Sequence, residues 1–161
     1  MDIFEFAMKM EQDGEAYYRE LAQNAVSTGF KNVFTMLANA EKIHYNVLKK
    51  MSDNEKVELS GSKLLSEVKN IFEQMKEEKN DADVPKTQID LYKKASEIEK
   101  KSMDFYLKQA DESSNPYHKD IFIRIADEEK RHFFIMEEIV NFVSQPSVWL
   151  ENPEWYHLDK D

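Results

Sequence analysis

An internal repeat constrains the fold of this chain more than any other feature of its sequence. Adding 88 to a residue number, with no gap, pairs Glu41 with Glu129 and His44 with His132. The same offset pairs further identical residues, namely Ala7 with Ala95, Glu11 with Glu99, Tyr18 with Tyr106, Ala22 with Ala110, Phe34 with Phe122 and Ala38 with Ala126. A helical hairpin repeated in this way, with a long crossover between its copies, predicts an all-α four-helix bundle.

Apolar residues recur at spacings of three and four in four long segments of the chain. This periodicity predicts helices over about residues 2–26, 30–52, 85–111 and 116–143. Gly29 is expected to end the first helix, and Pro146 the fourth, while Pro85 suits the first turn of the third. The scarcity of Gly (3) and Pro (4) among 161 residues fits long helices with few turns.

The crossover at residues 53–84 is predicted to contain a shorter fifth helix. Its apolar residues fall on one face, namely Leu64, Leu65, Val68, Ile71, Phe72 and Met75. The tail at residues 144–161 contains Trp149 and Trp155, and we expect it to pack as an irregular segment along the bundle or against a partner subunit. The chain length predicts one domain over residues 1–161.

Composition excludes several classes of function. A formal net charge of −10 argues against a nucleic-acid partner. No window of about 18 apolar residues exists for a membrane span. The chain has no Cys, which removes disulfides, zinc knuckles and Cys-ligated iron–sulfur or rubredoxin-type centres. The acidic N-terminus lacks the basic region of a secretory signal, so we expect a cytoplasmic protein.

Six ionisable residues fall on the core-facing stripes of the four long helices. They are Glu11, Glu41, His44, Glu99, Glu129 and His132. Each hairpin turns about midway between the Glu of its first helix and the Glu-x-x-His of its second. Because helices rise about 1.5 Å per residue, all six side chains are expected at nearly one level of the bundle. Burying them together is costly unless something compensates their charge.

A pair of divalent metal ions supplies that compensation. Four carboxylates balance two ions of charge +2, and each ion gains one imidazole. Small residues near the site leave room for metal, water or a small oxidant, namely Gly14, Ser102, Ala38 and Ala126. Oxygen and nitrogen ligands together suit iron or manganese. The alternative is two capped or salt-bridged core histidines, although repetition at one offset argues against it.

The chain resembles the ferritin-like superfamily, and within it the rubrerythrin-like proteins that lack a rubredoxin domain. The resemblance rests on "MEQDGEAYYRELA", "IEKKSMDFYLKQA", the two Glu-x-x-His helices and a tail, "WLENPEWYHLD". It implies a non-haem di-iron centre with the same six residues as ligands. Rubrerythrins have a further carboxylate in the third helix, which has no clear counterpart here, because Glu97 lies only two positions from Glu99. Whether Glu15 or Glu97 adds a seventh ligand stays open.

Other residues near the site have weaker signals. Tyr18 and Tyr106 lie seven residues after a ligand Glu, and are either hydrogen-bonding partners that orient a carboxylate or core tyrosines with a satisfied hydroxyl. Glu15 is expected at the surface or beside the site rather than as a ligand. Glu154 and His157 form a third Glu-x-x-His outside the repeat, which we expect to serve tail packing or the surface.

The resemblance implies an oxidoreductase that reduces hydrogen peroxide, or one that oxidises Fe(II) with dioxygen or peroxide. Without Cys the chain has no thiolate-ligated electron relay, so we expect an external electron-donor protein. A metal-dependent redox or oxygen sensor and a metal-free structural bundle are the alternatives. The apolar tail and the crossover helix favour a homodimer.

Overall fold

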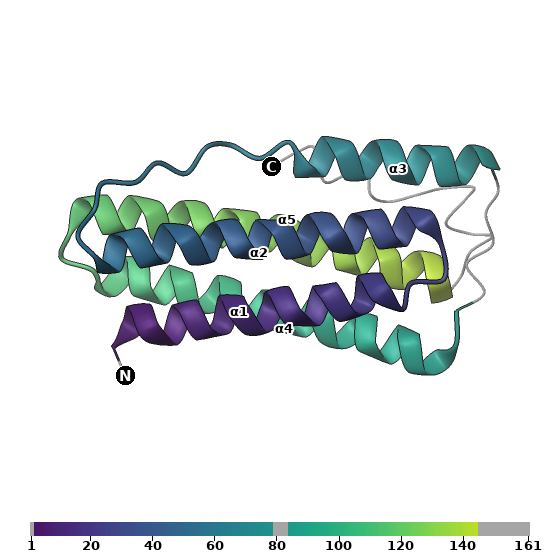
Figure 1. Cartoon of the computed structure of the whole chain (residues 1–161), viewed down its shortest axis with the longest axis horizontal. Helices are drawn as coiled ribbons and strands as arrows, with labels where there is room; N and C mark the ends of the chain where they lie inside the picture. The colour runs from purple at the N-terminus through teal and green to yellow at the C-terminus, as the bar shows by residue number, and fades with distance from the viewer. Residues whose placement is uncertain (1, 79–83, 145–161) are drawn as a thin grey trace.

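The computed structural model describes residues 2–78 and 84–144, and its described part is helical throughout apart from the connections. The helices are α1 (Ile3–Gln23), α2 (Thr28–Ser52), α3 (Leu64–Glu78), α4 (Lys86–Glu112) and α5 (Pro116–Ser144). Helices α1 and α2 form one antiparallel hairpin, and α4 and α5 form the other (Figure 1). The short helix α3 lies outside the bundle along α2 and α5 (Figure 1). The predicted all-α, ferritin-like bundle with an extra crossover helix is confirmed.

Capping residues mark where the helices begin, and some of these boundaries differ from the predicted ones. The side chain of Asp2 accepts a hydrogen bond from the Glu5 amide at 2.8 Å, which caps α1. Ser27 caps α2 in the same way through the Phe30 amide at 3.2 Å. The first helix therefore ends earlier than predicted, and Pro85 precedes α4 as its cap residue.

The prediction that Gly29 ends the first helix is wrong, because Gly29 lies in the first turn of α2. Its small size serves packing between helices. A Cβ atom at this position would lie 2.8 Å from the sulfur of Met75, which belongs to α3. The missing side chain therefore lets the crossover helix approach α2 closely.

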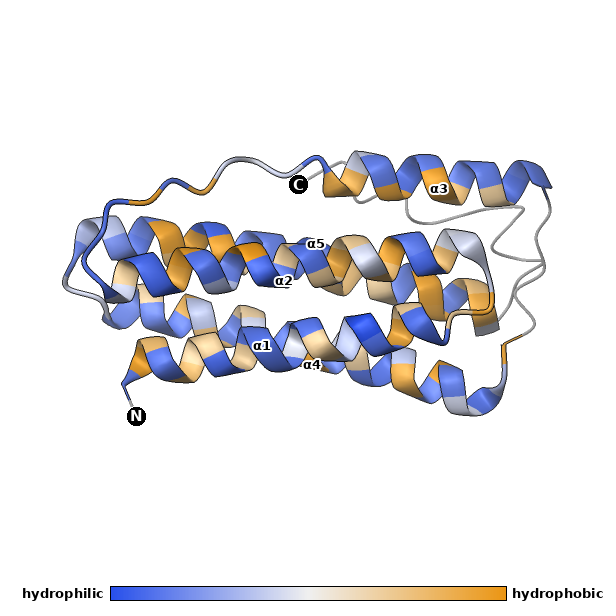
Figure 2. Cartoon of the chain, in the orientation of Figure 1, coloured by the Kyte–Doolittle hydropathy of each residue, from blue (hydrophilic) through white to orange (hydrophobic). Residues whose placement is uncertain are grey.

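The bundle buries apolar residues in two separate clusters. One contains Phe30, Phe34 and Tyr92, with Phe142, near the end where α1 runs into α2. The other contains Leu48, Tyr106 and Phe122 near the opposite end. Orange and blue residues alternate along the helices, as amphipathic packing requires (Figure 2).

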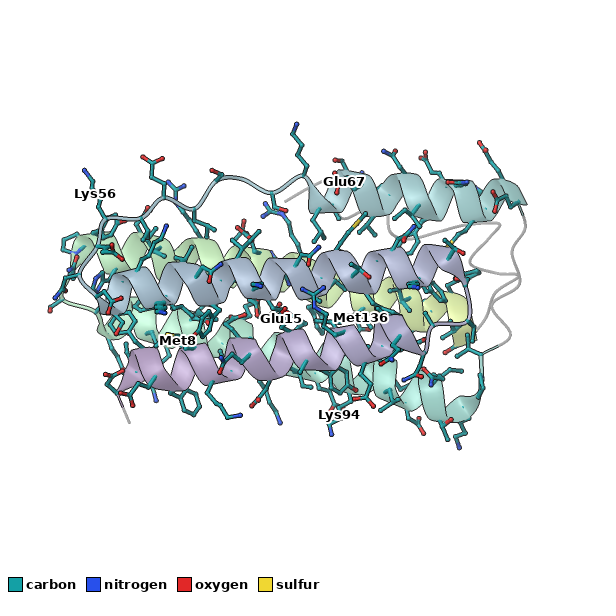
Figure 3. All side chains as sticks on the ribbon, in the orientation of Figure 1. Met8, Glu15, Lys56, Glu67, Lys94 and Met136 are labelled. Atoms are coloured by element: carbon teal, nitrogen blue, oxygen red, sulfur yellow. The ribbon has the colours of Figure 1, made fainter. Side chains whose placement is uncertain are left out.

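The side chains at the outside and inside of the bundle differ accordingly. Lys56 and Glu67 project away from it, whereas Met136 is fully buried (Figure 3). No helix within the described residues is long and apolar enough to cross a membrane. The predicted tail, with Trp149, Trp155, Glu154 and His157, lies outside the described residues.

Candidate metal centre

A charged layer separates the two apolar clusters of the bundle. On each long helix the predicted ligands lie between residues of one cluster and residues of the other, as Glu11 does between Ala7 and Tyr18. The six residues are each between 0 and 3% exposed to solvent: Glu11, Glu41, His44, Glu99, Glu129 and His132. The structure therefore brings together at one level all six residues that the repeat singled out.

The six residues form two overlapping groups with the dimensions of metal sites. One group contains Glu11, Glu41, His44 and Glu129, and the other contains Glu41, Glu99, Glu129 and His132. Within each group, one ligand atom per residue lies within 4.8 Å of the others. Two glutamates, Glu41 and Glu129, belong to both groups. Each group could hold one metal ion, with Glu41 and Glu129 common to both and one further carboxylate and one imidazole in each.

Both histidines direct the same ring nitrogen into the cluster. Nδ1 of His44 lies 3.2 Å from Glu129 Oε1 and 3.6 Å from Glu11 Oε2. Nδ1 of His132 lies 3.2 Å from Glu41 Oε1 and 3.5 Å from Glu99 Oε2. The two rings are nearly parallel, with centroids 6.0 Å apart. Each imidazole therefore faces one of the two cation positions through Nδ1.

Two buried tyrosines connect the hairpins through the outer carboxylates. Tyr18 of α1 donates a hydrogen bond to Glu99 Oε1 of α4 at 2.8 Å. Tyr106 of α4 donates to Glu11 Oε1 of α1 at 2.6 Å. Each tyrosine thus orients the glutamate of the opposite hairpin rather than the one on its own helix. Burial raises the pKa of both hydroxyls, so they remain protonated donors at neutral pH.

A contact that sequence reasoning missed lies outside His44. Its Nε2 lies 2.9 Å from Glu128 Oε1, so the imidazole N–H donates to this carboxylate while Nδ1 faces the cluster. Glu128 is 12% exposed and stands where the repeat has Ala40. That departure from the repeat was the one signal in the sequence that could have marked it.

The other acidic candidates lie apart from the cluster. Glu15 accepts hydrogen bonds from Arg19 at 2.8 and 3.2 Å and belongs to neither group. Glu97 is exposed to solvent and belongs to neither group. Gly14 has a direct role in space, because a Cβ there would lie 3.2 Å from Glu41 Oε2.

The electrostatics of the protein alone leave the cluster poorly compensated. Buried atoms without a hydrogen-bond partner include Glu11 Oε2, Glu99 Oε2, both oxygens of Glu129 and Nδ1 of His44. Burial, and then the charges of Glu11 and Glu129, raise the pKa of Glu41 well above its usual range. Burial and Glu129 raise the pKa of Glu99 to about 7. Carboxylates in this position bind protons when no cation is present.

Burial alone would lower the pKa of both histidines, but the neighbouring carboxylates raise it. Burial lowers the pKa of His132, yet the charges of Glu99 and Glu129, whose oxygens lie 3.5 and 3.3 Å from its Nδ1, raise it to about 10. Burial acts against ionisation of Glu129, but the imidazoles of His132 and His44, whose Nδ1 atoms lie 3.3 and 3.2 Å from its Oε1, lower its pKa to about 2. These shifts favour proton binding by the cluster when no cation is present. The orphaned oxygens and paired imidazoles fit divalent cations of iron or manganese type.

The family to which the chain belongs agrees with this geometry. The rubrerythrin family model matches residues 2–139, which shows that the chain is a member of the rubrerythrin family. No curated protein and no solved structure matches the chain. Family membership and the buried carboxylate and imidazole groups together point to a di-iron protein.

Proposed function

We propose that this protein is a non-haem di-iron oxidoreductase that reduces hydrogen peroxide with electrons from a separate donor protein. The observation that supports the proposal most directly is the pair of four-residue groups with Glu41 and Glu129 in common. The reaction consumes hydrogen peroxide, two protons and two electrons, and yields two molecules of water. With no Cys in the chain, the electrons must come from outside it.

The proposed iron ligands divide between the two positions. Glu11 and His44 would hold one ion, Glu99 and His132 the other, and Glu41 and Glu129 would bind both. When bound, an iron pair supplies the two electrons that cleave the O–O bond. Manganese suits the same donors, and elemental analysis of protein purified without oxygen distinguishes the two metals.

The surrounding residues would position the ligands and keep bulk water out. Tyr18 and Tyr106 hold one oxygen of each outer glutamate, which leaves the second oxygen for a cation. Glu128 fixes the ring of His44 with its Nδ1 inward. The apolar clusters flank the site on both sides, which would keep bulk water from the bound ions.

The proposal is tested by loading the protein with Fe(II) without oxygen and adding one equivalent of hydrogen peroxide. We expect near-ultraviolet absorbance of the oxidised iron pair, and repeated turnover once a chemical reductant is supplied. Glu99→Gln should abolish turnover, whereas Glu97→Gln, two residues away at the surface, should not. Oxidation that is faster with dioxygen and excess Fe(II) would instead indicate Fe(II) oxidation as the function. A single oxidation without turnover would indicate a sensor.

A further inference from the structure

The two proposed cation positions differ in how their histidines are held from behind. The repeat makes the two sets of ligands identical, but it places Ala40 in one half where the other half has Glu128. Because the hairpins cross, Glu128 of α5 contacts His44 of α2. Ala40 of α2 has no polar side chain to offer His132 in return. The departure from the repeat therefore gives His44, and not His132, a carboxylate within hydrogen-bonding distance of its outer nitrogen.

His44 has a carboxylate near each of its two ring nitrogens. Its Nε2 lies 2.9 Å from Glu128 Oε1, and its Nδ1 lies 3.2 Å from Glu129 Oε1. The ring is fully buried, and Glu128 is itself mostly buried. A carboxylate on the far nitrogen fixes the orientation of a histidine ligand and makes its inner nitrogen a stronger donor.

Among the described residues, carboxylates approach His132 at its inner nitrogen only. Its Nδ1 lies within hydrogen-bonding distance of Glu41, but no described residue partners its Nε2. The ring borders a small recess of about 10 Å³, formed with Ser62, Leu64, Leu65, Glu128 and Arg131 where α3 begins. That volume is about the size of one water molecule. His132 is thus the only one of the six predicted ligands that lines this recess.

We propose that the two cation positions are unequal. The position of Glu11 and His44 binds the first divalent ion tightly, and the position of Glu99 and His132 binds the second more weakly and exchanges it through the recess. Glu128 is the positioning residue that creates the difference. Loss of such a carboxylate partner typically lowers metal affinity about 10- to 100-fold, and this is the ratio that we expect between the two steps. The inference depends on the proposed metal centre.

The experiment is a calorimetric titration of the metal-free protein with Co(II), whose visible spectrum reports each added ion. We expect two separate steps of one ion each. His132→Ala should remove the weak step and keep the tight one, and His44→Ala should do the reverse. A chelator should extract one ion from the loaded protein faster than the other.

Glu128→Ala leaves the Nε2 atoms of both histidines without a carboxylate partner among the described residues. The tight step should weaken about 10- to 100-fold until the two steps merge, while Glu128→Gln, which keeps an acceptor oxygen without the charge, should restore part of the difference. Glu97→Ala removes one exposed carboxylate and is the matched control, with unchanged steps. Helix content measured by circular dichroism shows whether each variant folds. If Glu128→Ala does not fold, the titration of the wild-type protein alone still tests whether the two positions differ in affinity.

The outcomes separate the two proposals. Two equal steps, or one cooperative step with two ions, in the wild-type protein would overturn the inequality and leave the metal centre intact. Two steps that Glu128→Ala leaves separate would overturn the role of Glu128. No Co(II) binding at all would overturn the metal centre, and the proposed function with it.

Discussion

The two hairpins of this bundle are alike at the centre and different around it. The glutamates, the histidines and the tyrosines that hold them recur in both halves. One shell further out, Gly14 corresponds to Ser102, Glu15 to Met103, and Ala40 to Glu128. The buried charges must balance as a set, which leaves little freedom at the centre. The neighbouring positions are free to diverge, and there the two halves acquire different properties.

The largest effect should come from the two shared glutamates, and it should be the same in either half. Glu41→Ala and Glu129→Ala each remove a ligand from both positions. Because metal binding to the native state is linked to folding, each variant should lose metal and melt at a lower temperature than the loaded wild type. Metal content and thermal unfolding measure this, with Glu97→Ala as the surface control.

A substitution that removes only the charge at residue 41 should have the opposite effect on melting in metal-free protein. There burial and the neighbouring carboxylates raise the pKa of Glu41, so that folding requires it to take up a proton; Glu41→Gln, which is neutral already, removes that cost and should raise the melting temperature. Unchanged melting and unchanged metal content in both the Glu41 and Glu129 variants would contradict the proposed metal centre.

The next effect is a pH dependence that metal reverses. In metal-free protein the pKa of His132 is raised to about 10, from 6.5 in the unfolded chain. Its protonated form therefore contributes stability that is complete below about pH 6.5 and is lost as pH rises toward 10. The raised pKa of His44 acts in the same direction. Metal-free protein should thus unfold more easily at pH 9 than at pH 6.

Loaded protein should show no such loss, since the cations displace those protons and bind more strongly as pH rises. Thermal unfolding between pH 6 and 9 tests the expected loss of stability in the presence of chelator and its expected absence in the presence of metal. His44→Gln and His132→Gln should each flatten the metal-free profile in part, which compares the two hairpins directly. A flat profile for the metal-free wild type would show that protonated histidines do not hold the cluster together.

A smaller loss of stability is expected from replacing the two tyrosines, which occupy equivalent positions in the two hairpins. Tyr18→Phe and Tyr106→Phe each remove one hydrogen bond to a buried carboxylate, a loss of about 1.5–3 kcal/mol in the free energy of unfolding. Tyr17→Phe, which removes a bond from the neighbouring partly buried residue to the Leu91 carbonyl, is the control and should cost less. Denaturant unfolding of the three variants measures this. A cost for Tyr18 or Tyr106 no larger than that for Tyr17 would count against their role in holding the carboxylates.

The sequence predicted which residues meet in the buried charged cluster, but it did not predict the contacts around that cluster, and the reason is physical. The positions of Glu11, Glu41 and His44 follow from helical periodicity and the repeat, both of which depend on local spacing. The contact from Glu128 to His44 depends on how two helices cross, and no spacing along one helix encodes it. Gly29 misled the prediction because its small size serves the approach of α3, a tertiary contact, rather than a helix end.

The smallest effect is expected at Gly14 of the first hairpin, whose counterpart in the second hairpin is Ser102. Glycine within a helix ordinarily destabilises it by about 0.5–1 kcal/mol relative to alanine, so Gly14→Ala should gain part of that in metal-free protein, where the Glu41 carboxylate can shift. In loaded protein Glu41 would be fixed between two cations, and the new methyl group would press on its Oε2 from 3.2 Å. Gly14→Ala should therefore raise the melting temperature without metal and weaken metal binding.

Ser102→Ala supplies the matched control in the other hairpin. It adds no atom near a carboxylate, so it should leave metal affinity unchanged. Calorimetric titration and thermal unfolding of both variants measure the two effects separately. Equal metal affinity in Gly14→Ala and the wild type would mean that Glu41 has space to move even when it holds cations, and that Gly14 is not needed for the close approach of α1 to the site.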